Sequence, residues 1–513
     1  GRNGPAGCCR SFRRRSAKHG RRDPSCAPGV VMVDAVKIAA RAPAPAPVSS
    51  PGRRMTPSPF PPPRFGDELR ASARLAAPLI AGHVSTGLIG LVDALIAGRH
   101  GTATLAAVSV GTALFWLPLL VPMGTLIAVP ASVSQLDGAG RRDEIGPLFR
   151  QALWLALLLG LGMFVFLSLI PLALEALGIA AEIRPGATAF VHGIRWGVPA
   201  LALFLCMRYL CDGLHHTIPT MLLGFGGLLL LIPTGYGLTF GLGGLPALGA
   251  GGLGLASALV MWLQALGLWG YLARTRRFGD LHLLDRYEPP RWPPIRSLLV
   301  LGLPIGFTWL MEGGLFVATA LVIGRLGAVP AAAHQIAINV ASLCFMVPMA
   351  LAEATTVRVG HAVGRGDRDG LRRAAFAGLV LVLLSQSITG AALFFGNDAI
   401  AALYTGDAAV IALASSLLLM AAAFQFPDGI QVLSVGALRG LKDTRMPMLI
   451  AAFAYWGIGM PLGAILGLGL DGWIPALGPS GMWIGLIAGL TVAAALLGMR
   501  FLRMSRGVPI VSV

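Results

Sequence analysis

The sequence predicts an all-α polytopic membrane protein with twelve transmembrane helices in two pseudo-symmetric six-helix bundles. Three observations lead to this fold class. The 513 residues are 55% hydrophobic and only 12% charged, with a mean hydropathy of +0.74, whereas a soluble domain carries about 25% charged residues. The apolar residues gather into twelve long segments. The last six of these segments repeat the first six in sequence.

Each apolar segment is long enough to cross a bilayer, because about 20 residues at a rise of about 1.5 Å span a hydrocarbon core of about 30 Å. The 68 glycines and 36 prolines of the chain suit closely packed and interrupted membrane helices. The predicted spans are residues 73–98, 104–132, 150–175, 187–208, 217–240, 248–273, 298–324, 332–357, 374–396, 408–434, 447–469 and 478–502.

A basic head rich in Arg, Pro, Ser and Ala occupies positions 1–64. No run in it could pack a core, so we expect disorder, and it lacks the apolar region of a signal peptide. Met32 and Met55 are candidate start sites, so a start-site artefact is an alternative to a real tail. We assign the head no function.

The net charge of +17 comes from the head and the loops, which argues against a nucleic-acid partner. The head holds 13 Lys/Arg and two acids. Beyond it, 23 Lys/Arg lie in or beside the even-numbered loops and the flanking segments. The opposite side carries four: Arg99, Arg184, Arg195 and Arg325. Since cytoplasmic loops carry the Lys/Arg excess, we expect both termini in the cytoplasm.

The two halves of the chain repeat one another. One constant register superposes glycines and prolines throughout: Pro78 on Pro304, Gly98 on Gly324, Gly101 on Gly327, Pro122 on Pro348, Gly138 on Gly364 and Gly140 on Gly366. We call it the repeat register. The halves start six spans apart, so they share one orientation and are related by an axis along the membrane normal. Such repeats are typical of transporters that bind cargo between the halves.

The repeat continues beyond these positions, but the offset between the two halves becomes one residue larger. GLHHTIPTML, which starts at Gly213, matches GLKDTRMPML, which starts at Gly440. This pairing defines a second register, which we call the slipped register. The similarity of the halves therefore extends into the loops that end the fourth and tenth spans.

The repeat and the loops together divide the chain. We expect a cytoplasmic linker to join the two bundles and a short tail to follow the second. The predicted domains are the head at 1–64, an N-terminal bundle at 69–273, the linker at 274–297, a C-terminal bundle at 298–503 and the tail at 504–513.

Glu312 is the ionisable residue near the middle of the seventh span. A carboxylate at that depth costs roughly 2.5 kcal/mol or more, so it needs a structural or functional reason. Thr308 and Thr319 lie on its helical face, and Gly313 and Gly314 would let a neighbouring helix or ligand approach closely. The seventh span offers no basic partner, which favours a functional role over a structural one.

Asp428 lies in the tenth span, between Pro427 and Gly429. The proline favours a kink that frees backbone carbonyls, and Gln425 and Gln431 add a polar stripe. A carboxylate beside free carbonyls is a candidate site for a hard cation. The alternative is a polar kink that is hydrogen-bonded to a neighbouring helix.

Asp93 is the acid of the first span, with Ser85 and Thr86 near the same helical face. Its repeat counterpart is Thr319, so the shared scaffold does not require an acid there. We expect a proton or cation site. The alternative is a buried carboxylate satisfied by neighbouring donors.

The eighth span carries a line of polar residues, Gln335, Asn339, Ser342 and Glu353, which should face the protein interior or a wet cavity. We expect Glu353 to form a salt bridge with Arg358 at the cytoplasmic helix end.

Several other residues of the spans have simpler explanations. We expect His334 to be a histidine with satisfied hydrogen bonds, and Asp212 to pair with Arg208 at a helix end. Five soft or aromatic side chains could line a cavity, but core packing or lipid contact is the favoured role: Trp309, Met311, Phe316, Phe345 and Met346.

Four stretches of the sequence resemble the multidrug and toxic compound extrusion (MATE) family, in its NorM-like bacterial branch. They are GLVDALIAGRHG, AHQIAIN, VRVGHAVGRGD and FQFPDGIQVLSVGALRGLKDTRMPMLI. The resemblance covers about residues 69–503. It implies two six-helix bundles in a V around a central cavity, and export of cationic or amphipathic organic compounds in exchange for Na+ or H+.

The resemblance also implies a cation site in the C-terminal bundle, formed by Glu312 and Asp428, with Asp93 contributing to coupling. These two carboxylates would be metal ligands only if Na+ is the coupling ion. Thr308, Gln335, Asn339, Gln425 and Gln431 are candidates for a supporting polar lining. At Glu353 the family more often has a small or apolar residue, so this acid departs from the pattern.

These observations predict an antiporter of a bacterial inner membrane rather than an enzyme. We expect small organic cations as cargo, the lipid bilayer as the surrounding partner, no cofactor besides the coupling ion and function as a monomer. No GxxxxGK(S/T) motif for nucleotide binding is present in the sequence.

Two alternatives remain for the function. One is a flippase for lipid-linked oligosaccharides, a cargo that related folds carry; its cavity should be cationic, whereas the deep charges here are acidic. The other is a membrane-embedded prenyltransferase, which needs paired aspartates of DxxxD type. Asp367 and Asp369 come nearest, but their spacing is wrong.

Overall fold

The structure, a computed structural model, describes residues 64–175, 178–244, 246–470, 473 and 475–507, all within one compact unit. The predicted head, except Arg64, and residues 508–513 of the predicted tail lie outside this range. Within the described residues, twelve helical segments are long and apolar enough to cross a membrane. The predicted all-α fold class and the number of spans are confirmed.

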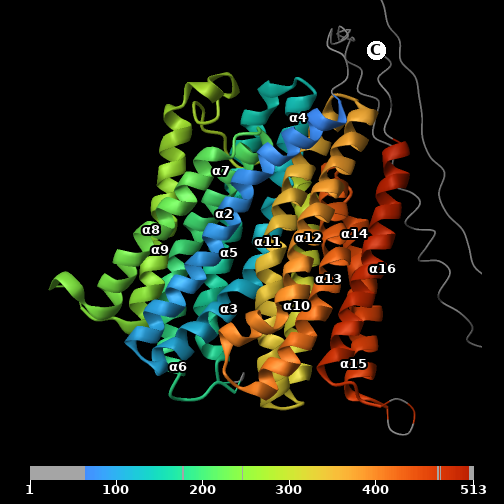
Figure 1. Cartoon of the computed structure of the whole chain (residues 1–513). Coiled ribbons are helices and arrows are strands. Elements are labelled where there is room, and N and C mark those ends of the chain that lie inside the picture. The colour runs from blue at the N-terminus through green and yellow to red at the C-terminus, as the bar shows by residue number, and fades with distance from the viewer. Residues whose placement is uncertain (1–63, 176–177, 245, 471–472, 474, 508–513) are drawn as a thin grey trace, which may run out of the picture. The chain divides into compact units, whose positions relative to one another are not determined.

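The N-terminal half comprises α2 (Phe65–His100), α3 (Thr102–Leu126), α4 (Ala128–Gly138), α5 (Ile145–Ala173), α6 (Arg184–Ile194), α7 (Val198–Gly213), α8 (Ile218–Phe240) and α9 (Gly249–Arg274). The C-terminal half comprises α10 (Trp292–Gly324), α11 (Ala328–Gly364), α12 (Arg368–Tyr404), α13 (Ala408–Gly440), α14 (Arg445–Ala451), α15 (Met460–Leu468) and α16 (Pro479–Arg506). Figure 1 shows the first half in blue to green and the second in yellow to red.

Three of the predicted spans are interrupted. A break at Ile127 separates α3 from α4, a short 3₁₀ turn separates α6 from α7, and a π-helical stretch, Ala452–Gly459, separates α14 from α15. The helix that follows each interruption carries a proline in its first turn: Pro130, Pro199 and Pro461. A proline costs least there, because the first-turn N–H groups have no partner within the helix.

One end of the bundle carries the basic loops, and we call it the basic end. These loops follow α4, α7, α9, α11 and α13, at residues 139–144, 214–217, 275–291, 365–367 and 441–444. In Figure 1 it is the upper end, where α2 begins and α16 ends. Several helices extend past the predicted limits there, because charged turns can continue a helix beyond the apolar stretch that hydropathy detects.

Glycines bring the two halves into contact. Helix α3 packs on α10, and α11 packs on both α2 and α4. A Cβ on Gly124 of α3 would lie 2.5 Å from the Cα of Gly306 on α10. Because such a distance is far inside van der Waals contact, these backbones meet only where both residues lack side chains.

A second glycine contact follows the internal repeat. Gly138 of α4 lies against the carbonyl of His361 on α11, and Gly364 of α11 lies against the carbonyl of Gln135 on α4. The repeat register converts each contact into the other. The interface is therefore isologous about the pseudo-two-fold axis, as in a symmetric dimer.

Polar contacts also join the halves near the basic end. The guanidinium of Arg358 on α11 donates two hydrogen bonds, of 2.8 and 2.6 Å, to the carboxylate of Glu68 on α2. Gln135 donates from its side-chain amide to the carbonyl of Gly440, at 2.8 Å. Bidentate pairs of the Arg358–Glu68 kind add geometric specificity as well as energy.

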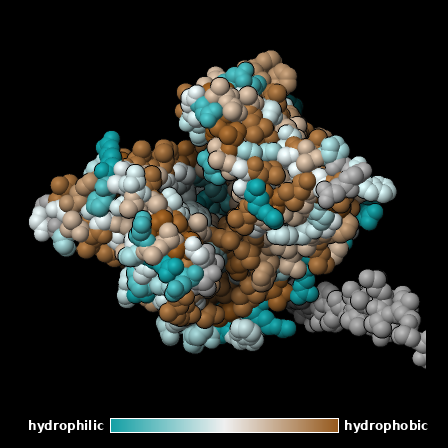
Figure 2. All heavy atoms as spheres, turned by 90° about the horizontal axis from the view of Figure 1, so that it is seen from below, coloured by the Kyte–Doolittle hydropathy of each residue, from teal (hydrophilic) through white to brown (hydrophobic). Residues whose placement is uncertain are grey.

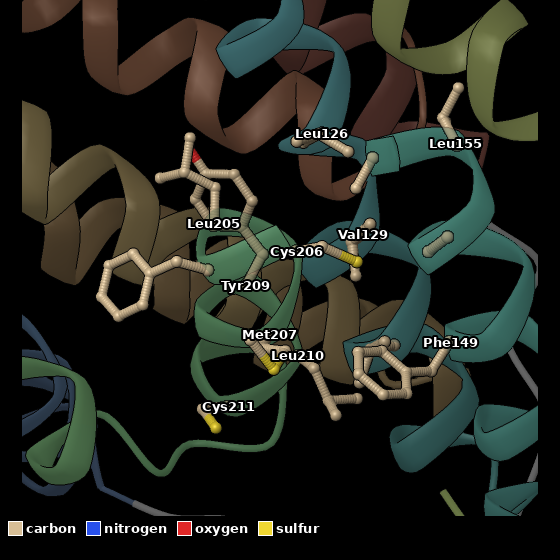
Figure 3. Packing of buried hydrophobic residues seen from close by; sticks show 14 of the residues in the cluster. Leu126, Val129, Phe149, Leu155, Leu205, Cys206, Met207, Tyr209, Leu210 and Cys211 are labelled. Carbon is tan, nitrogen blue, oxygen red and sulfur yellow. The ribbon is translucent and has the colours of Figure 1, made fainter. Parts of the chain in front are cut away.

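Each half has its own apolar core. In the N-terminal half, α3, α4, α5 and α7 pack around Leu126, Phe149 and Leu210, which are fully buried (Figure 3). In the C-terminal half, Tyr455 and Trp483 are fully buried among side chains of α11, α13 and α16. Apolar packing also crosses between the halves, since Ile305 of α10 belongs to the cluster around Leu126, and Leu79 of α2 belongs to a cluster with Leu351 of α11.

Substitution of Gly306 by Ala tests the close contact between the halves. We expect a loss of about 1–3 kcal/mol of stability, because the new Cβ would lie 2.5 Å from the carbonyl oxygen of Val121. Thermal unfolding of the purified protein measures this loss. The matched control is Gly162→Ala in α5, where a Cβ meets nothing within 4 Å and Ala should stabilise the helix by up to about 1 kcal/mol. Equal effects would contradict the proposed close contact.

His215, in the turn between α7 and α8, gives a pH-dependent prediction. Burial, helped by His361, Arg358 and Arg365, lowers its pKa from 6.5 to about 3. Below about pH 6.5, His215 therefore becomes protonated in the unfolded chain but stays neutral in the folded protein. Stability should then fall toward pH 3 by up to about 1.4 kcal/mol per pH unit.

The variant His215→Asn tests this prediction. Asn tolerates the positive φ of 58° at this position and does not titrate. Unfolding of both proteins between pH 7 and pH 5 should show a smaller loss of stability in the variant. Equal slopes would show that the histidine is not responsible.

Candidate functional site

A cavity of about 880 Å³ lies between the two halves, lined by side chains of α2, α3, α7, α8, α9, α10, α11 and α13. Figure 2, which looks onto the end opposite the basic end, shows a hollow between the masses of the protein. The inter-half contacts described above close the basic end. A cavity of this size and position suits a small organic ligand.

The lining of the cavity is largely aromatic and soft. Trp309, Phe316, Phe345 and Met346 all face it. Trp309 and Phe316 also pack against the apolar cores, as expected, but the expectation did not place these four side chains on the cavity. Met311 does not line the cavity, and its backbone carbonyl accepts a hydrogen bond from the indole of Trp456 at 3.2 Å. Hydropathy could not distinguish a cavity-facing apolar side chain from a lipid-facing one.

Glu312 lines the cavity from the middle of α10 and is partly exposed to it. Its neighbour Gly313 also faces the cavity, which leaves room beside the carboxylate. Thr308 lies elsewhere: it is buried, and its hydroxyl donates to the carbonyl of Pro304 at 2.8 Å within the same helix. The structure therefore places the acid, but not this threonine, in the lining.

Asp428 is buried in α13, behind the cavity wall, with 4% of its surface exposed. Glu312 lies near enough for the two carboxylates to repel each other, and both act electrostatically on the hydroxyl of Tyr455. The structure thus brings the two predicted acids of the C-terminal half together.

Unpartnered polar atoms surround Asp428. One carboxylate oxygen of Asp428, the side-chain oxygen of Gln431 and the hydroxyl of Tyr455 have no protein hydrogen-bond partner. Orphaned buried polar atoms mark places where water or an ion completes the bonding. With Glu312 they form an all-oxygen donor set, which suits a proton or a hard cation such as Na+. We refer to Glu312, Asp428, Gln431 and Tyr455 as the acidic chamber.

Gln425 supports α13 from behind. Its side-chain oxygen accepts a hydrogen bond of 2.5 Å from Thr389 of α12, and its backbone carbonyl accepts one of 3.0 Å from Gln386. Helix α13 continues without a break through Pro427. Of the two glutamines of the predicted polar stripe, Gln425 is therefore bonded to α12.

Asp93 is not brought together with the other two acids. It is buried in α2 of the N-terminal half, one of its oxygens has no protein partner, and it does not line the cavity. Ser85 and Thr86 both line the cavity, and the hydroxyl of Thr86 donates a hydrogen bond of 3.1 Å to the carbonyl of Gly82.

The polar line of α11 faces the cavity, as the sequence predicted. Asn339, Ser342 and Glu353 all line it, and Gln335 donates a hydrogen bond of 3.1 Å to Asn339. The predicted salt bridge between Glu353 and Arg358 is wrong, because that arginine reaches Glu68 instead.

Two further expectations have opposite outcomes. Asp212 pairs with Arg208 at 3.5 Å, as predicted. His334 is buried but neither ring nitrogen has a hydrogen-bond partner, so the expectation of satisfied hydrogen bonds is wrong; its ring contacts that of Trp483, with centroids 6.0 Å apart. No cluster of three or more His, Cys, Asp or Glu suited to a metal ion occurs in the searched part of the chain.

The sequence reasoning missed four residues of this region: His83, Tyr209, Arg439 and Tyr455. His83 and Tyr209 line the cavity. Arg439 is 1% exposed and its guanidinium has no hydrogen-bond partner. A signal existed for Arg439, because in the slipped register it is the repeat counterpart of Asp212.

Comparison with known proteins agrees with this architecture. The sequence model of the MatE family matches residues 78–237 and 304–465, two stretches that begin at the repeat counterparts Pro78 and Pro304. The chain is 65% identical over 444 residues to "Probable multidrug resistance protein NorM" of Xanthomonas axonopodis pv. citri (strain 306), covering 86% of this chain and 96% of that protein. It is 42% identical over 445 residues to "Multidrug resistance protein PmpM" of Pseudomonas aeruginosa, covering 86% and 93%.

Solved structures share the fold. The eukaryotic MATE transporter AtDTX14 superposes with a TM-score of 0.78 at 19% sequence identity, covering 86% of this chain and 98% of that one. An outward-facing multidrug resistance MATE family transporter of the MOP superfamily gives 0.77 at 20% identity, covering 86% and 97%.

Proposed function

The chain belongs to the MatE family of multidrug and toxic compound extrusion transporters, and from this premise we propose that it exports cationic or amphipathic organic compounds in exchange for Na+ or H+. One observation carries the proposal: Glu312 faces the cavity while its neighbour Asp428 lies among unpartnered oxygens behind the wall. A single acidic chamber can therefore serve cargo on one side and a coupling ion on the other.

In this exchange, the cargo and the coupling ion compete for the negative charge of Glu312. Organic cations and the coupling ion both neutralise Glu312, so binding of one disfavours the other. A proton would be held on one of the two carboxylates, and Na+ would take the oxygens of Asp428, Gln431 and Tyr455 together with Glu312. Relative motion of the halves would then move the opening of the cavity from one end of the bundle to the other.

The orientation follows from the charge of the loops. We propose that the basic end faces the cytoplasm of a bacterial cell, with the chain spanning the plasma membrane and both termini inside. The hollow in Figure 2 then opens to the exterior, which is the state that releases cargo. Since one chain supplies both halves and the whole cavity, we propose that the monomer transports.

The alternative functions have less support. A flippase for a pyrophosphate-linked cargo needs free cations in its cavity, but Arg208 is flanked by Glu353 and Asp212. A prenyltransferase needs paired metal-binding aspartates. Asp367 instead caps α12 by accepting a hydrogen bond of 2.7 Å from the backbone of Gly370.

Neutralising either acid of the chamber should abolish coupled export. We expect Glu312→Gln and Asp428→Asn each to lower ion-driven accumulation of ethidium in everted vesicles by about tenfold or more, since a lost coupling of about 1.4 kcal/mol already gives tenfold. Gradients of Na+ and of pH, imposed separately, identify the coupling ion.

The matched control is Asp398→Asn, an exposed acid of α12 outside the cavity lining. It should transport at the wild-type rate, with comparable protein in the membrane. Unchanged transport in both chamber variants would refute the assignment.

The orientation has its own test. A cysteine replacing Glu182, exposed at the end opposite the basic end, should react with a membrane-impermeant maleimide added to intact cells. One replacing Asp143, exposed at the basic end, should react only after the cells are opened. The reverse pattern would invert the proposed orientation.

A further inference from the structure

The end of the cavity nearest the basic end carries a second carboxylate, Glu353 of α11. It lines the cavity together with Glu312, and its side chain is 8% exposed. Two basic side chains of the other half of the protein lie beside it. The Nε2 of His83 on α2 lies 3.1 Å from its Oε2, and the guanidinium of Arg208 on α7 lies 3.7 Å away. Both side chains also line the cavity.

The internal repeat does not require this cluster. In the repeat register, Glu353 corresponds to Ile127 and His83 to Trp309, and in the slipped register Arg208 corresponds to Val435. The scaffold is therefore built in the other half without these charges. A buried acid that is free of a scaffold role is a candidate for function.

Arg208 can leave Glu353 without becoming an unpaired charge. It lies between two carboxylates, with Glu353 at 3.7 Å and Asp212, one turn along its own helix, at 3.5 Å. Neither oxygen of Asp212 accepts a hydrogen bond, so this acid has capacity to hold the guanidinium alone. The contact between Arg208 and Glu353 exceeds hydrogen-bond distance, which makes it displaceable.

Arg439 and Tyr209 complete the charged and titratable surroundings of Glu353. They face it across a small cavity of about 10 Å³, which Asp212 also lines. Arg439 belongs to the same half as Glu353 and remains beside it when the halves separate. Its guanidinium also lies over the ring of Trp309, 5.9 Å from the centroid. The two halves thus each hold a carboxylate and a guanidinium at this level.

We propose that Glu353 is a second cation-binding carboxylate of the cavity, which takes the charged group of an organic cation, and that Arg208 and His83 are tethered competitors that occupy it when the basic end closes. The proposal rests on the proposed function for the class of cargo only. It does not depend on which ion drives transport or on the acidic chamber.

The arrangement would supply a means of release. When the halves part at the basic end, Glu353 loses its contacts with Arg208 and His83 of the N-terminal half and can accept cargo. When they close again, Arg208 and His83 return to Glu353 and displace the cargo toward the opposite end. An organic cation and the two side chains compete for one carboxylate.

Equilibrium binding of ethidium to the purified full-length protein tests the proposal, because it needs no ion gradient. We expect Glu353→Gln to weaken binding about tenfold and Arg208→Gln to strengthen it severalfold. When both substitutions are combined, the gain in affinity from Arg208→Gln should vanish. Without the carboxylate of Glu353, removal of Arg208 frees no binding site. A different double variant, Arg208→Gln/Asp212→Asn, removes the arginine with its second partner, and it should also bind more tightly.

The matched control is Glu68→Gln, which breaks another cross-half ion pair whose acid does not line the cavity. It should leave ethidium affinity unchanged. The proposal is overturned if Arg208→Gln weakens binding in a protein that elutes and unfolds like the wild type, or if its gain persists without Glu353. If the chamber variants keep coupled transport while Glu353→Gln and Arg208→Gln change ethidium affinity as predicted, the coupling mechanism fails and this proposal stands.

Discussion

A charge inside this bundle must be neutralised wherever the protein holds it, because water is scarce there and the cost of an unpaired ion is several kcal/mol. The structure meets this constraint in two ways. Glu353 is neutralised by side chains of the other half. The acidic chamber instead keeps two repelling carboxylates beside unpartnered oxygens. The first solution depends on the position of the halves, and the second, in the proposed function, on a bound ion.

The scaffold that carries these charges is symmetric, whereas the charges are not. Gly138 and Gly364 exchange places under the repeat, and each lies against the helix that carries the other. Such an isologous contact can close and open as a unit. The acids follow a different rule, because Glu312 has Thr86 as its counterpart and Glu353 has Ile127. Symmetry thus provides the interface between the halves, and departures from it provide the acids that we propose to bind charged groups.

Two kinds of feature can be predicted from the sequence: periodic apolar segments, and single residues whose burial in a membrane costs free energy. Twelve apolar runs define the spans, and a lone carboxylate such as Glu312 is conspicuous in a membrane segment. Pairings between distant segments are not visible in the sequence. Glu353 of the eighth span pairs with His83 of the first. Arg358, little more than one helical turn from Glu353, is the partner that the local sequence suggests. The cavity-facing side of α10 is equally hidden, because apolar faces toward lipid, core and cavity have the same composition. Hydropathy alone does not predict the breaks at Ile127 and in the π-helical stretch, because the apolar run continues through both.

Helix α10 joins the ion site to the moving interface. It carries Glu312 on the cavity and Gly306 in the contact with α3, less than two turns apart and hence about 9 Å along the axis. A rigid helix transmits a small displacement over that distance, and the glycine contact tolerates little displacement because both backbones already touch. Neutralising Glu312 removes its repulsion with Asp428 and so changes the force on α10 at the place where the halves meet. In the proposed mechanism, an ion bound at Glu312 would therefore influence the contact between the halves and, through it, the access to Glu353.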